Sequence, residues 1–154
     1  MSPPALVESE ARFVHDLRAF WRRAKDKPQW RDCEIYLLRN QARSGIDLFT
    51  GVGFYPDFLM WLKRRAKQVL CFVEPKGLGR AWPQAKIDLV AKIEKQSPPG
   101  LPLRGFTVTP TPLAEIQRLR AEVTKESLAV DHILLQGSTD DYIARILLSL
   151  RSAL

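Results

Sequence analysis

The chain has 154 residues, 45% of them hydrophobic and 27% charged, which is typical of one globular domain and excludes a disordered or collagen-like chain. Its two cysteines and two histidines are too few for a disulfide framework or a zinc site, and its apolar runs are too short to span a membrane. The net charge of +7, from 24 lysines and arginines against 17 acidic residues, favours a polyanionic partner.

The N-terminal segment lacks a secretory signal and shows a helical pattern. Residues 1–12 contain no basic start followed by an apolar block, so we expect a single cytoplasmic domain over residues 1–154 with no membrane partner. Apolar residues recur at steps of three or four to about residue 24, which predicts an amphipathic helix that starts near Pro3 and Pro4. Glu10 lies within its apolar stripe, whereas Glu8 lies on the polar side that faces water.

The next part of the chain shows the patterns of β-strands. Residues 33–39 alternate with a period of two, which predicts a first strand, and a short second strand can follow at about 46–49. Two further strands are expected at 57–62 and 69–74, separated by a basic loop at 63–67. The run at 69–73 is apolar throughout, so we expect its strand to be buried on both faces in the middle of the sheet.

The C-terminal half alternates helices and strands. Proline and glycine signals, apolar periodicity and acidic first turns divide it into five elements. They are a helix at 83–96, a strand at 103–109, a helix at about 111–124, a strand at 130–135, and a helix from Ser138 or Thr139. The whole order, α-β-β-β-β-α-β-α-β-α, predicts an α/β fold with helices around a mixed sheet.

Two carboxylates meet in the predicted hairpin of strands 57–62 and 69–74. If the hairpin closes around residues 63–68, Asp57 lies directly opposite Glu74. Facing carboxylates ~5 Å apart repel, and a hard divalent cation such as Mg²⁺, which binds one or two carboxylates plus phosphate, supplies the counter-charge. Lys76 points to the same face if strand geometry persists through Pro75, so the pattern predicts a phosphodiester site. Alternatively, Pro56-Asp57 forms a common turn and Glu74 simply ends a strand.

The same segment resembles the signature of the PD-(D/E)XK nuclease superfamily, in Pro56-Asp57 followed by Glu74-Pro75-Lys76. The wider strings 38–40, 53–58 and 74–78 look more narrowly like the nuclease domain at the C-terminus of DEAD/DEAH-box helicases of the type III restriction kind. The resemblance implies a restriction-endonuclease-like αβββαβ core, Mg²⁺ dependence with Mn²⁺ as a substitute, and cleavage of nucleic acid. It makes Asp57 and Glu74 metal ligands, the Pro75 carbonyl a third ligand, and Lys76 the residue that orients the attacking water.

Further site residues follow from the resemblance together with helix phase. Superfamily members often add a glutamate from the first helix, for which phase favours Glu10; a first-turn helix acid is the alternative. They also place a basic residue of the second helix against DNA, which points to Lys86 and then Lys92, with ordinary surface lysines as the alternative. Arg39 and Asn40, at a strand end, contact phosphate or position Glu10, or else form a buried structural pair.

We therefore predict a Mg²⁺-dependent DNA endonuclease domain that works with, or is fused to, a superfamily 2 helicase or translocase. This helicase or translocase is expected to select where the domain cuts, because contacts with backbone charge carry no sequence information. One alternative is a non-catalytic DNA-binding or helicase-docking module that retains the fold, against which the intact Asp57, Glu74 and Lys76 argue. Another is a basic protein-interaction domain in which Asp57 and Glu74 lie far apart.

Overall fold

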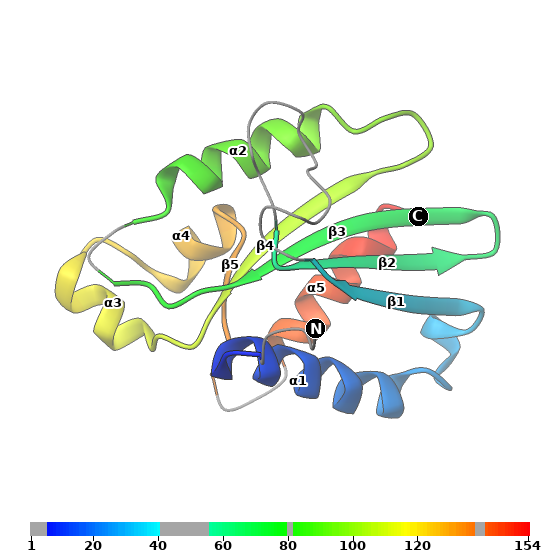
Figure 1. The fold of residues 1–154 in the computed structure, drawn as a ribbon, viewed down its shortest axis with the longest axis horizontal. Helices are drawn as coiled ribbons and strands as arrows, with labels where there is room; N and C mark the ends of the chain where they lie inside the picture. The colour runs from blue at the N-terminus through cyan, green and yellow to red at the C-terminus, as the bar shows by residue number, and fades with distance from the viewer. Residues whose placement is uncertain (1–5, 41–55, 80–81, 138–140) are drawn as a thin grey trace, which may run out of the picture.

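Helices pack on both faces of a five-stranded mixed sheet in the computed structural model, which describes residues 6–40, 56–79, 82–137 and 141–154 (Figure 1). The strands lie in chain order across the sheet: β1 (Cys33–Arg39), β2 (Phe58–Arg64), β3 (Lys67–Pro75), β4 (Leu103–Thr109) and β5 (Ile133–Leu135). Strands β1, β2 and β3 pair antiparallel, whereas β3, β4 and β5 pair parallel. The predicted α/β class and mixed sheet are confirmed.

Strand β3 is the central strand of this sheet. Its residues from Val69 to Pro75 are all buried, because helices cover both of its faces. The apolar run at 69–73 therefore has the place that its composition predicts. Close packing extends to β4, where Gly105 faces Phe72 so closely that a Cβ atom would overlap the phenyl ring.

The helices form two layers, one on each face of the sheet (Figure 1). Helices α1 (Glu8–Ala24) and α5 (Asp141–Ser152) cover one face, where Phe13 and Ile146 join Met60 in the largest apolar cluster. Helix α2 (Gln84–Lys95) covers the other face, and α3 (Leu113–Leu119) and α4 (Lys125–Val130) pack beside it. A short 3₁₀ helix, η1 (Pro28–Trp30), follows α1. Among the described residues, no helix is both long and apolar enough to cross a membrane.

The β2–β3 hairpin has the predicted register but a tighter turn. Leu59 pairs with Phe72, as a hairpin closed around residues 63–68 requires. The residues expected to form a basic loop continue the ladder instead, and only Arg65 and Ala66 form the turn, with Arg65 in the left-handed region at a φ of 56°. The expected basic loop is therefore wrong, since its lysines and arginines lie mostly on strands.

The C-terminal half differs from its prediction between residues 111 and 135. One helix to about residue 124 and a strand from Val130 were expected, but α3 ends at Leu119 and α4 occupies Lys125–Val130. The Thr124 side chain accepts the Ser127 N–H at 3.0 Å and so caps a new helix. His132, with a φ of 57°, then ends α4 before β5 begins. The predicted helix start near residues 2–4 is wrong, because Val7 is extended and caps a helix that begins at Glu8. The second strand at 46–49 and the helix start at 138 or 139 lie outside the described residues.

Candidate functional site

Three strand ends meet where the predicted carboxylates lie. Phe58 at the start of β2 pairs with Val73 of β3. The Asn40 N–H, just after β1, donates to the Asp57 carbonyl oxygen at 2.8 Å, so the ladder continues one residue beyond Phe58. One further step along the β2–β3 register brings Asp57 opposite Glu74. The hairpin predicted from the sequence places the two residues in the same way.

Both carboxylates belong to the face of the sheet that α2 covers. Phe72 of β3 packs with Leu59 of β2 and Ile93 of α2 in one buried cluster. Because side chains alternate along a strand, Glu74 shares the face of Phe72, and Asp57 shares that of Leu59. The site therefore lies between the ends of β2 and β3 and helix α2.

Asp57 is surrounded by charges of both signs. Its pKa is raised from 3.8 to about 6, first because burial disfavours the charged carboxylate, and then because Glu74 and Glu10 are negative neighbours. Lys86 and Arg39 act in the opposite direction and lower this pKa. The structure thus brings together three carboxylates and two cations contributed by α1, β1, the start of β2, β3 and α2.

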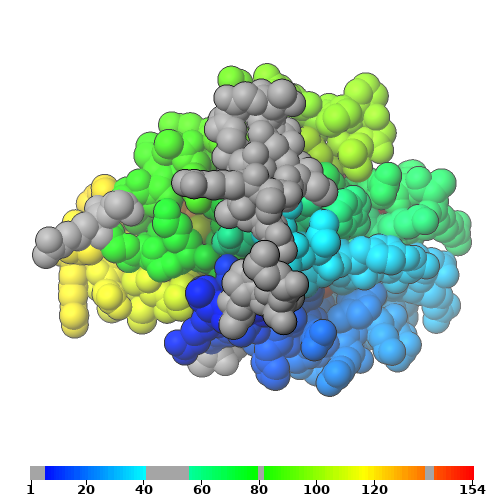
Figure 2. All heavy atoms as spheres, in the orientation of Figure 1, coloured from blue at the N-terminus to red at the C-terminus, as the bar shows by residue number. Residues whose placement is uncertain are grey.

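Two ion pairs neutralise Glu74 and Glu10, the two carboxylates that raise the pKa of Asp57. The Lys86 Nζ atom lies 2.8 Å from Oε2 of Glu74, whose side chain is only 9% exposed. The Arg39 Nη2 atom lies 3.4 Å from Oε2 of Glu10, which is 12% exposed and also accepts the Val7 N–H at 3.2 Å. Figure 2 shows α1, in blue, lying directly against β1, in cyan. Glu10 therefore caps its own helix and pairs with Arg39, and its negative charge helps to raise the pKa of Asp57.

Lys76 follows the strand geometry that the sequence analysis assumed. Its N–H donates to the Val108 carbonyl oxygen at 2.8 Å, so the ladder extends beyond Pro75, the buried last residue of β3. Alternation then directs the partly exposed Lys76 side chain to the face of Glu74. The ammonium that contacts Glu74 is nevertheless that of Lys86. Lys86 is predicted from the sequence to lie against DNA, and its pairing with Glu74 is not predicted, because the position of a helix over a sheet depends on tertiary structure.

The remaining candidate residues divide into those that join the cluster and those that do not. Glu8 is exposed and Glu10 mostly buried, so the predicted helix phase is right. Asn40 is buried, at 7% exposure, which favours its structural role over a contact with DNA. Lys92 is exposed and, six residues after Lys86, points about 120° away from it around α2. It is not part of the cluster.

The donor atoms at this site suit a hard divalent cation. Asp57 and Glu74 offer carboxylate oxygens, and Pro75 offers a backbone carbonyl beside them. Mg²⁺ prefers oxygen ligands and commonly binds one or two protein carboxylates together with water and phosphate. Within the described ranges, no three side chains of the His, Cys, Asp and Glu types form a metal-binding group. The protein would therefore supply a bound cation with two carboxylates and one backbone carbonyl, and water and substrate would complete its coordination.

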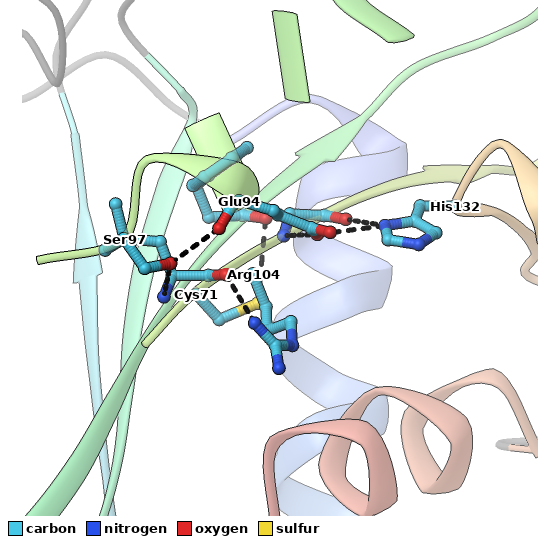
Figure 3. A network of polar contacts seen from close by, with 8 residues as sticks. Cys71, Glu94, Ser97, Arg104 and His132 are labelled. Atoms are coloured by element: carbon cyan, nitrogen blue, oxygen red, sulfur yellow. Dashed lines mark hydrogen bonds and ion pairs between the residues drawn. The ribbon is translucent and has the colours of Figure 1, made fainter. Parts of the chain in front are cut away.

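A second polar cluster lies at the opposite end of α2 (Figure 3). The Glu94 Oε1 atom accepts the Gly105 N–H at 3.0 Å and lies 3.0 Å from Nδ1 of His132. This contact raises the pKa of His132, which partial burial and Arg104 oppose. The cluster ties α2 to β4 and to the turn before β5. The sequence does not predict this cluster, and its one signal is the acidic residue Glu94 next to the buried Ile93.

The arrangement of charges defines what the first cluster can do. Adjacent carboxylates at the ends of β2 and β3 can hold a cation, and Lys76, Lys86 and Arg39 add positive charge around them.

Comparisons of the chain with protein-family models, curated proteins and solved structures gave no match.

Proposed function

We propose that the chain is a Mg²⁺-dependent nuclease domain that hydrolyses phosphodiester bonds in DNA, with Asp57 and Glu74 as the cation ligands. The observation that carries the proposal is the position of Asp57 beside Glu74, with a pKa raised to about 6 by burial and by neighbouring carboxylates. Such a pair calls for a cation, and a net charge of +7 favours a polyanionic substrate. The order α1-β1-β2-β3-α2-β4 is also that of the αβββαβ core which the resemblance implies.

Each charged residue of the site has a role in this proposal. Asp57, Glu74 and the Pro75 carbonyl would hold Mg²⁺, which when bound lowers the pKa of a water and neutralises charge on the phosphate. Lys76 adds a fixed positive charge on the same face and orients the attacking water. Glu10, which pairs with Arg39, is a positioning residue: its negative charge near Asp57 strengthens the attraction of the site for a cation.

The proposed substrate contacts are directed at the phosphate backbone. Lysine and arginine side chains at such a site position DNA without reading its sequence. We therefore infer that a superfamily 2 helicase or translocase, in the same polypeptide or a separate one, selects where the domain cuts. Alone, the domain should bind DNA with little sequence preference and lose affinity steeply as salt rises.

A cleavage assay with matched variants tests the proposal. The purified protein should nick plasmid DNA with Mg²⁺ or Mn²⁺ and not with Ca²⁺ or EDTA. The Asp57→Asn and Glu74→Gln variants should lose about 100-fold or more of this activity, since each removes the negative charge of a cation ligand. Glu122→Gln, at an exposed residue away from the site, is the control and should cleave like the unchanged chain. Equal cleavage by all four proteins would refute the assignment.

A non-catalytic DNA-binding module is the second candidate function. The observation that favours it is the direct pairing of Lys86 with Glu74 and of Arg39 with Glu10, which neutralises carboxylates without a metal. In that case the protein should bind DNA in a salt-dependent way but cleave none with Mg²⁺ or Mn²⁺. The same assay, combined with a binding titration, distinguishes the two functions.

A further inference from the structure

The candidate site balances its charge internally. Glu10, Asp57 and Glu74 contribute three negative charges when ionised, and Lys86, Arg39 and Lys76 contribute three positive charges. The balance is therefore zero. A divalent cation beside Glu74 changes it to +2 and competes with the Lys86 ammonium for the same carboxylate oxygen.

The two paired cations, Lys86 and Arg39, differ in how firmly they are held. The Lys86 side chain is 40% exposed and reaches Glu74 through a flexible four-carbon stem, whereas Glu74 is fixed on a central strand. Arg39 is less exposed, at 31%, and pairs with a Glu10 carboxylate that also caps α1. Lys86 is therefore the more exposed and more flexible of the two cations.

We propose that Lys86 is an exchangeable counter-ion that couples cation binding to DNA binding. It pairs with Glu74 in the metal-free protein and turns to a DNA phosphate when a divalent cation takes that carboxylate. DNA then strengthens cation binding, and by thermodynamic reciprocity the cation strengthens DNA binding by the same factor. This coupling rests on the proposed function, since it requires a cation at Glu74.

The Lys86→Met variant separates this role from that of an ordinary phosphate contact. An ordinary contact would be lost equally with and without the cation. An exchangeable counter-ion leaves DNA binding in EDTA nearly unchanged, because Lys86 is then engaged with Glu74, and weakens DNA binding only when the cation is present. Lys95→Met is the matched control, because Lys95 is an exposed lysine of the same helix on its opposite side.

Two titrations measure the effect. Fluorescence anisotropy gives the affinity for a short duplex in EDTA and in Ca²⁺, and electron paramagnetic resonance of free Mn²⁺ gives the affinity for Mn²⁺ without DNA. For the unchanged chain and Lys95→Met, Ca²⁺ should strengthen DNA binding by about 5-fold or more. For Lys86→Met this factor should be clearly smaller, because only the direct attraction between cation and phosphate remains, and Mn²⁺ should bind more tightly without DNA. Circular dichroism verifies that each variant is folded.

The results distinguish failure of the inference from failure of the proposed function. If Glu74→Gln abolishes Mn²⁺ binding but Lys86→Met leaves both the coupling factor and Mn²⁺ affinity unchanged, the exchange is wrong and the metal site stands. If Lys86→Met weakens DNA binding equally in EDTA and Ca²⁺, Lys86 is an ordinary phosphate contact. If Mn²⁺ binding is absent or indifferent to Glu74→Gln, the proposed function fails and the coupling fails with it.

Discussion

The Asn40 N–H donates to the Asp57 carbonyl oxygen at 2.8 Å, which extends the β1–β2 ladder beyond its last paired residues. This bond holds the backbone of Asp57 in line with β2, so its carboxylate stays beside Glu74. Burial and like charge make that position costly for an ionised aspartate. The ionised Asp57 is therefore electrostatically unfavourable in the folded protein, and a bound cation would offset this cost.

Replacing Asp57 should stabilise the metal-free protein above pH 6. The pKa of Asp57 is raised to about 6, so its contribution to stability is full below pH 3.8 and is lost as pH rises through 6. Asp57→Asn, which does not ionise, should raise the free energy of unfolding at pH 8 by about 1 kcal/mol, allowing for solvent screening. Urea unfolding at pH 4 and pH 8 measures it. Asp26→Asn, at an exposed turn, is the control; a gain that is equal at both pH values would contradict the electrostatic cause.

The Glu94–His132 pair should stabilise the fold mainly at low pH. Glu94 raises the pKa of His132 above 6.5, so the stabilisation is full below pH 6.5 and is lost as pH rises through the higher, folded-state value. Glu94→Gln, which keeps an acceptor for the Gly105 N–H, should therefore destabilise the protein more at pH 6 than at pH 9. Chemical denaturation at both pH values, with an NMR titration of the His132 ring, tests this. The same loss at both values would show that the charge is unimportant.

A side chain at position 105 should lower the stability of the fold, because it would overlap Phe72. A Cβ atom at this position would overlap the Phe72 ring, and both residues lie within the central pair of strands. Gly105→Ala should lower the free energy of unfolding by about 1–3 kcal/mol through overpacking, and Phe72→Leu in the same chain should restore part of it. Gly79→Ala, where a Cβ atom meets nothing within 4 Å, is the control. Equal stability of the two alanine variants in thermal unfolding would contradict the packing.

Local patterns were enough to predict strands β1 to β4 and the register that brings Asp57 near Glu74. The apolar run at 69–73 identified the central strand, and a short hairpin permits only a few registers, so the position of Asp57 relative to Glu74 followed from the loop. Helix phase separated Glu10 from Glu8 in the same way. These features depend on residues close in the sequence.

Contacts between distant elements could not be predicted in this way. Lys86 reaches Glu74 only because α2 crosses the sheet at one particular place, and Glu94 meets His132 for the same reason. The break between α3 and α4 was missed because the Thr124 cap outweighs the helical pattern around it.

Crystals soaked with Mn²⁺ test the central claim most directly, because the ion's anomalous scattering locates it without reference to activity. The account predicts one strong anomalous peak between Asp57 and Glu74, with a carboxylate oxygen of each at ~2.0–2.6 Å from the ion. It also predicts that the Lys86 ammonium has left Glu74. Crystals that show no peak between these residues, with Lys86 still paired to Glu74, would contradict the account.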